Sequence, residues 1–124
     1  MAQNKLVRFG PVALTTTMTT NILNPTVTSL SGPVGFTLSQ PYFILRHIRI
    51  INKTGTTATF SLWVGATGAN AAGTEIVGSG WPISANSAFD LPCALRLDAA
   101  DFLVGGAGTT LALVFEAEGE VGFS

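Results

Sequence analysis

The stretch from Tyr42 to Val64, YFILRHIRIINKTGTTATFSLWV, constrains the fold more than any other part of the chain. Apolar and polar residues alternate with a period of two on both sides of a polar turn, and β-branched and aromatic residues are frequent. Such alternation, bounded by turn residues, is typical of half-buried β-strands. The sequence therefore predicts two strands joined by the turn at residues 52–56, and we expect this hairpin to form the centre of a sheet.

The same alternation assigns the side chains of these strands to two faces. One face of the first strand carries Ile44, Ile48 and Ile50, and the other carries His47 and Arg49. In the second strand Ala58, Phe60, Leu62 and Val64 share a face, while Trp63 lies opposite with threonines and a serine. The isoleucine and phenylalanine face is the expected core side.

The rest of the chain also reads as short strands separated by turn signals. A threonine-rich strand is predicted over 12–19, a short strand at Phe36 and Leu38, a turn at 105–108 and a last strand over 109–117 that Gly119 interrupts. Asn52 and Asp98 are expected to turn the chain by bonding backbone two residues ahead.

No segment shows a 3.6-residue period. Many short strands predict an all-β fold, an antiparallel, jelly-roll-like β-sandwich with an extended N-terminal segment. Residues 1–24 are expected to form an arm or edge strands, and 25–124 a single domain.

Charged residues make up only 10% of the 124 residues, and the formal net charge is −1. Soluble domains usually carry about 25% charged residues, and a net charge near zero favours association. We therefore expect much of the surface to contact other protein. The six basic residues form no stripe that would follow phosphates, which argues against nucleic acid. No apolar run suggests a signal peptide or a membrane helix, so a soluble product made in the cytoplasm is expected.

The sequence offers few groups for catalysis or metal binding. His47 is the only histidine and Cys93 the only cysteine, which leaves too few ligands for a structural zinc site and no internal disulfide. No G-x-S-x-G motif is present. Glu116, Glu118 and Glu120 are expected on one strand face, where they would suit a calcium site, glycosidase chemistry or, more simply, a solvated or interface face. We predict no catalytic, cofactor or metal site.

The expected function of the outward residues is contact with a partner. Trp63 is either an outward aromatic anchor or a residue covered by the N-terminal segment. Arg46 and Arg49 would pair with acidic groups of a partner, or with Glu116 and Glu118. The candidate interface residues are Lys5, Arg8, Arg46, His47, Arg49, Trp63 and Trp81.

Several runs in the last two-thirds of the chain, from LRHIRIINKTGTTATFSLWVG onward, resemble small β-sandwich virion proteins of tailed bacteriophages. The shared features are a hairpin, a strand start and an L-x-L-x-A-x-D-x-L corner. The matching positions are Ile48, Asn52, Thr54, Ala58, Thr59, Leu62, Ala85, Asn86, Leu95, Leu97, Ala99, Asp101 and Leu103. The segment 10–41 is longer than the usual lead-in to this hairpin.

The resemblance implies a non-enzymatic structural protein located in the virion, without a cofactor. The expected function is that of a capsid decoration (cement) protein, a small homo-oligomer, most simply a trimer, that binds the major capsid protein or other virion proteins. The alternatives are an accessory protein of the neck, tail or fibre, or a receptor-binding or carbohydrate-binding module.

Overall fold

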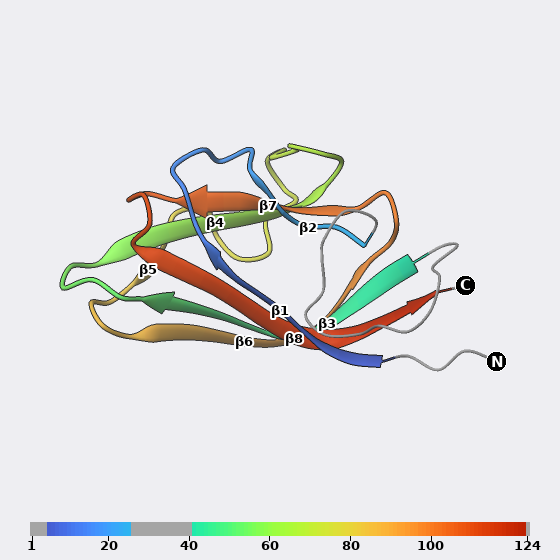
Figure 1. Cartoon of the computed structure of the whole chain (residues 1–124). Helices are drawn as coiled ribbons and strands as arrows, with labels where there is room; N and C mark the ends of the chain where they lie inside the picture. The colour runs from blue at the N-terminus through green and yellow to red at the C-terminus, as the bar shows by residue number, and fades with distance from the viewer. Residues whose placement is uncertain (1–4, 26–40, 124) are drawn as a thin grey trace.

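The computed structural model describes residues 5–25 and 41–123, which form strands and no helix (Figure 1). The prediction of an all-β, antiparallel chain is confirmed. The predicted strand at Phe36 and Leu38 lies outside the described residues. The strands are β1 (Lys5–Ala13), β2 (Asn21–Leu23), β3 (Pro41–Asn52), β4 (Ala58–Gly65), β5 (Trp81–Ile83), β6 (Ala88–Leu97), β7 (Phe102–Ala107) and β8 (Leu113–Phe123).

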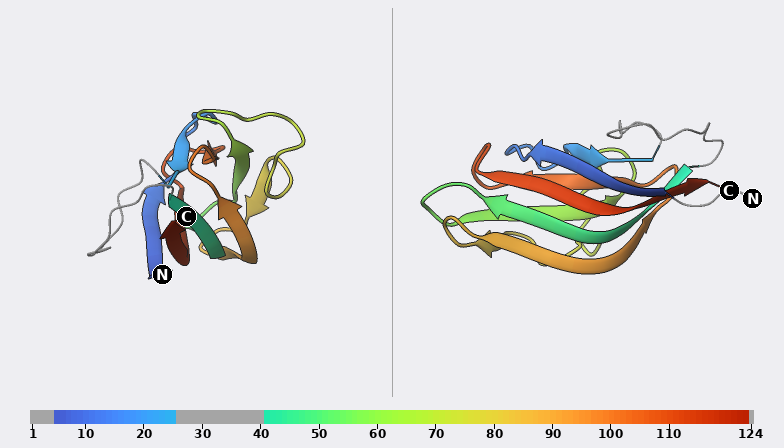
Figure 2. Two further views of the ribbon diagram at one scale, coloured as in Figure 1. Left: turned by 90° about the vertical axis from the view of Figure 1, so that its right-hand side faces the viewer. Right: turned by 60° about the horizontal axis from the view of Figure 1, so that its bottom comes forward.

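The strands form two four-stranded antiparallel sheets, arranged as two layers (Figure 2). The strand order is β1-β8-β3-β6 in the first, here called sheet A, and β2-β7-β4-β5 in the second, sheet B. β1 and β2 are edge strands of the two sheets, so residues 5–13 and 21–23 are part of the sheets. The threonine-rich segment predicted as a strand contributes only its start, because β1 ends at Ala13 and residues 14–20 form no strand.

The expected hairpin between residues 42 and 64 was wrong in its pairing. β3 pairs with β6 and β8 in sheet A, whereas β4 pairs with β5 and β7 in sheet B. The turn after Asn52 therefore carries the chain from one sheet to the other. β3 and β4 each bury one apolar face. Because they belong to different sheets, these two faces point toward each other across a common core, whereas in a hairpin they would lie side by side in one sheet.

Asn52 fixes this crossing with a complete set of hydrogen bonds. Its side chain is 1% exposed, and Oδ1 accepts from the amide of Thr54 at 2.9 Å, which is the turn predicted from the sequence. Oδ1 also accepts from the Thr54 hydroxyl at 2.7 Å. Nδ2 donates to the carbonyls of Thr56, at 2.8 Å, and Ile83, at 3.0 Å. Because Ile83 belongs to β5, one amide ties the end of sheet A to the edge of sheet B.

The core lies between the sheets and is filled from both. The rings of Phe9 and Phe43 in sheet A are 4.6 Å apart, and the ring of Phe60 in sheet B lies 5.2 Å from that of Phe89 in sheet A. Ile48, Ile50, Phe60 and Leu62 are buried in this cluster as predicted. Ile44, predicted to join them, is only half-buried, because a register shift between Leu45 and His47 places Phe43 and Leu45 in the core instead.

Glycines occur inside two strands where the sequence predicted breaks. β8 continues through Gly119, where an added Cβ would collide with the carbonyl oxygen of Ile44 on β3. β7 likewise continues through Gly105, where a Cβ would collide with the backbone of Ser61 on β4. Both glycines permit close approach of a neighbouring strand rather than ending their own. The corner after β6 is also closed differently from the prediction, because the carboxylate of Asp101 accepts from the amide of Asp98 at 2.9 Å.

Candidate functional site: the outer face of sheet A

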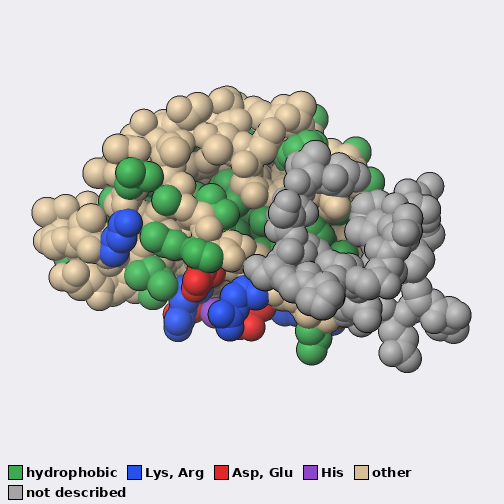
Figure 3. All heavy atoms as spheres, viewed as in Figure 1, with side chains coloured by type: hydrophobic (Ala, Val, Ile, Leu, Met, Phe, Trp, Pro, Cys, Tyr) green, Lys and Arg blue, Asp and Glu red, His purple; other side chains and the backbone are tan. Residues whose placement is uncertain are grey.

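The outward side chains of sheet A gather most of the charge of the molecule. Figure 3 shows charged atoms concentrated along the lower surface, where sheet A lies, while the rest of the visible surface is largely uncharged. Four of the six basic and four of the seven acidic residues project from this face, together with the only histidine. We call this the charged face; it consists of Arg8, Arg46, His47, Arg49, Asp90, Arg96, Glu116, Glu118 and Glu120.

The register of sheet A arranges these side chains in rows across the strands. Arg8 on β1 is level with Glu118 on β8, His47 on β3 and Pro92 on β6. The neighbouring row holds Glu116, Arg49 and Asp90. On the other side, the row is Leu6, Glu120, Ile44 and Arg96. Between residues 46 and 49, β3 therefore presents basic outward groups beside a stripe of carboxylates on β8.

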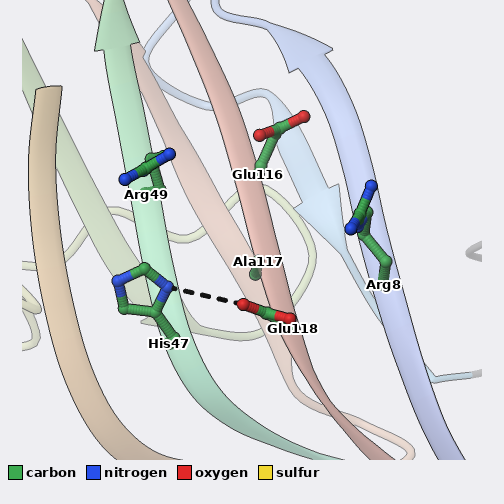
Figure 4. Close-up of a pocket in the computed structure, with 6 residues that line it drawn as sticks. All are labelled: Arg8, His47, Arg49, Glu116, Ala117 and Glu118. Atoms are coloured by element: carbon green, nitrogen blue, oxygen red, sulfur yellow. Dashed lines mark ion pairs between the residues drawn. The ribbon is translucent and has the colours of Figure 1, made fainter.

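Several ion pairs connect these strands. Arg49 Nε lies 2.9 Å from Asp90 Oδ1, and this oxygen is also 3.1 Å from His47 Nε2. His47 Nδ1 lies 3.8 Å from Glu118 Oε1 (Figure 4). The hydrogen bond and positive charge of Arg49 hold the pKa of Asp90 below its usual value, and the same hydrogen bond raises the pKa of Arg49. At the other end, Arg46 Nε donates to Glu120 Oε2 at 2.8 Å.

A shallow hollow of about 260 Å³ lies between β1 and β3 and crosses β8. Its polar lining comes from Arg8, His47, Arg49, Glu116 and Glu118, which Figure 4 shows on three neighbouring strands. Among the described residues, neither Arg8 nor Glu116 forms a side-chain ion pair or hydrogen bond. The hollow thus holds an arginine and a glutamate that form no close pair with other described side chains, although Glu116 acts on Arg49 through its charge.

These pairs contribute little to folding. The side chains of Arg46, Arg49 and Asp90 are 58%, 50% and 43% exposed, and water screens ion pairs that are exposed to this extent. Stability therefore does not explain the concentration of charge on one face. Charged rows on an exposed sheet are suited to recognising a complementary charged surface.

The candidate interface residues are divided between the two sheets. Arg8, Arg46, His47 and Arg49 lie together on the charged face, and Lys5 begins β1, although its side chain is outside the described part. Arg46 and Arg49 do pair with acids of the same chain, but with Glu120 and Asp90 rather than with Glu116 and Glu118. Asp90 was missed because alternation places it on the outer face of its strand without indicating which strand lies beside it.

The two tryptophans lie on sheet B. Trp63 points away from the core but is only 6% exposed, and its Nε1 donates to Glu75 Oε1 of the β4–β5 loop at 3.3 Å. The bonds that the Glu75 carboxylate accepts, chiefly from backbone amides, lower its pKa. Trp81 on β5 is 43% exposed, and its ring lies 6.1 Å from that of Phe89.

In the part of the chain that the structure describes, no three His, Cys, Asp or Glu side chains are grouped so that they could hold a metal ion. Cys93 Sγ donates to the Leu45 carbonyl at 3.2 Å, and burial raises the pKa of this thiol.

The described residues also include no helix able to cross a bilayer. Comparisons with protein-family models, curated proteins and solved structures found no match.

Proposed function

We propose that this chain is a non-enzymatic structural protein of a tailed-phage virion, most simply a capsid decoration protein that stabilises the shell as a small homo-oligomer. The observation that carries the proposal is the distribution of charge. The charged face holds four arginines and four acids, whose charges cancel, and few charged residues lie elsewhere. A largely neutral surface disfavours a solitary soluble protein and suits one that is covered by neighbours.

The strand order supports a more specific fold assignment, the jelly roll. β1 pairs with β8, β2 with β7, β3 with β6 and β4 with β5, as in a long antiparallel hairpin rolled into two layers. A jelly roll consists of eight strands in two sheets and is common among viral capsid proteins. The resemblance of the sequence to phage virion proteins points in the same direction, although a fold alone does not determine a function.

The sequence also allows an N-terminal arm over residues 2–24 that would reach along the shell, but such an arm would have to exclude β1 and β2. Residues 5–23 supply the edge strand of each sheet, and Phe9 is part of the core. Deleting residues 2–20 would remove β1 and most of the path to β2. That truncation would therefore unfold the domain and could not test an arm; removal of residues 2–4 alone is the appropriate variant.

The decisive measurement is the number of copies in purified virions, obtained by quantitative mass spectrometry against the major capsid protein. Hundreds of copies per particle would support decoration of the shell. A few to a few dozen copies would instead place the protein in the neck, tail or fibre. Absence from purified particles would refute a structural role in the virion.

One observation favours a second candidate, a carbohydrate-binding or receptor-binding module of a tail or fibre. Trp81 presents an exposed ring beside Gly78 and Gly80, and exposed tryptophan is suited to stacking on sugars. A glycan array would test this, with Trp81→Ala as the informative variant. Because Trp63 is covered by the β4–β5 loop, Trp63→Phe is the matched control and should retain any binding.

A further inference from the structure

The four sheet edges are poorly suited to pairing with another chain. β2 and β5 have three residues each, β6 contains Pro92, and the register of β1 shifts between Phe9 and Val12. Short strands, prolines and bulges are the features that prevent edge-to-edge association. An oligomer of this chain is therefore expected to form through a sheet face.

Of the two outer faces, only that of sheet A is open among the described residues. On sheet B, Ser61, Trp63 and Val104 point away from the core yet are at most 6% exposed. Residues 14–20 pass over β7, since a Cβ at Gly106 would contact the Thr15 and Thr17 carbonyls. The β4–β5 loop also bonds to this sheet, where the Gly80 amide donates to the Ser61 hydroxyl at 2.8 Å.

We propose that the charged face binds a second copy of the same chain, face to face, about a two-fold axis that runs parallel to the strands between β8 and β3. This rotation places β8 of one copy over β3 of the other and preserves the level of each residue. Glu116 then faces the Arg49 of the second copy, and Glu118 faces its His47. Both contacts occur twice, because a two-fold interface is isologous.

The charges disfavour two other kinds of two-fold axis in the plane of the sheet. An axis perpendicular to the strands, or one along β8, would set the glutamate stripe against itself. In the proposed arrangement β1 lies over β6 of the second copy, so Arg8 comes near Asp90, and Leu6, which is 86% exposed, lies over Arg96. The face has no net charge, because its four arginines and four acids cancel, so two copies meet without net repulsion.

The available area indicates a weak complex. Four strands spaced about 4.8 Å apart, each with about nine residues, offer about 600 Å² per copy, which is at the lower limit for specific interfaces. Because ion pairs are the main contacts of this interface, association should weaken sharply at about 1 M salt, where the screening length is about 3 Å. The neutral remainder of the surface stays available to other proteins, so this inference does not depend on the proposed virion function.

A charge-swap experiment tests the proposal with purified chain alone. Arg49→Glu and Glu116→Arg each place like charges opposite one another in a homodimer, which should raise the dimer dissociation constant at least about tenfold. Mixing the two variants should restore both contacts in the mixed dimer. The glutamate introduced at position 49 of the first variant then faces the arginine introduced at position 116 of the second. The unchanged Glu116 of the first variant faces the unchanged Arg49 of the second. The double variant on one chain should likewise regain homodimerisation. Lys53→Glu, in the exposed turn after β3, is the matched control and should behave as wild type.

Analytical ultracentrifugation at low and high salt provides the readout, and thermal unfolding of each variant shows that it is folded. A salt-sensitive dimer that the single variants lose and the mixture regains supports the proposal. A wild-type chain that is monomeric at low salt and high concentration overturns it. A trimer, or any oligomer that the single charge reversals leave intact, also overturns it.

Discussion

Replacing Asn52 should destabilise the fold, because its buried amide joins the two sheets. Asn52→Ala removes four hydrogen bonds at once, two donated by Nδ2 and two accepted by Oδ1. The lost partners differ in their access to water. Thr54 and Thr56 lie near the surface and can bond to solvent, but the carbonyl of Ile83 belongs to a residue that is 3% exposed.

The expected loss follows from these environments. A typical intramolecular hydrogen bond contributes about 1 kcal/mol net, and a buried group left without a partner costs about 1–3 kcal/mol. Counting the Ile83 carbonyl as unpaired and the other partners as largely rescued by water, we expect Asn52→Ala to lower the free energy of unfolding by about 2–4 kcal/mol. Asn52→Asp should cost about as much, because it retains the acceptor for Thr54 but turns an oxygen toward two carbonyls.

Equilibrium unfolding in urea is the appropriate assay, since a domain of this size is expected to unfold in two states. Asn70→Ala is the matched control, because Asn70 is exposed in the β4–β5 loop and forms no side-chain hydrogen bond among the described residues. The control should remain within about 0.5 kcal/mol of wild type. If Asn52→Ala also falls within that range, the crossing between the sheets is not held by this amide and the reasoning is refuted.

Two further predictions concern sheet A. Gly119→Ala should destabilise the protein by about 1–3 kcal/mol, because its methyl group would collide with the Ile44 carbonyl. Gly55→Ala is the control and should leave the melting temperature nearly unchanged, since no atom lies within 4 Å of the added carbon. Equal melting temperatures for the two variants would contradict the close approach of β3 to Gly119. Because the pKa of Asp90 is lowered in the folded chain, its carboxylate contributes stability that is present above its unfolded pKa and lost as the pH falls through the folded value. Asp90→Asn should therefore flatten the loss of stability measured by urea unfolding below about pH 4, and an unchanged pH profile would show that the pair with Arg49 adds no stability to the folded chain.

The sequence indicated which side of β4 and of the second half of β3 faces the core, because that depends on a local period of two. Alternation correctly buried Ile48, Phe60 and Leu62 and placed His47 and Arg49 on the opposite face. It could not indicate which strands lie side by side. Two consecutive amphipathic strands satisfy the same pattern whether they pair in one sheet or face each other across a core, and the second arrangement was the observed one.

The candidate site could be predicted only in part for a similar reason. The basic residues of β3 and the glutamates of β8 were recognisable as outward groups, but their pairing depends on register, which shifts by one residue at Arg46. With this shift, Arg46 forms an ion pair with Glu120 on β8. Arg49 forms its ion pair with Asp90 on β6, 41 residues further along the chain. The burial of Trp63 was equally hidden, because it depends on where the β4–β5 loop folds back.

The distribution of charge and the protection of the edges together limit how this chain can associate. A nearly neutral surface lowers the barrier to contact with other proteins, and unprotected edges on such a surface would favour unspecific strand pairing. Here the edges are short, shifted in register or interrupted by proline, and one sheet face lies under loops. The remaining open face carries ordered rows of opposite charge, which oppose misaligned contacts through repulsion between like charges. In the proposed dimer the same rows would favour a geometry in which opposite charges face each other, and a repeating assembly likewise requires a defined geometry.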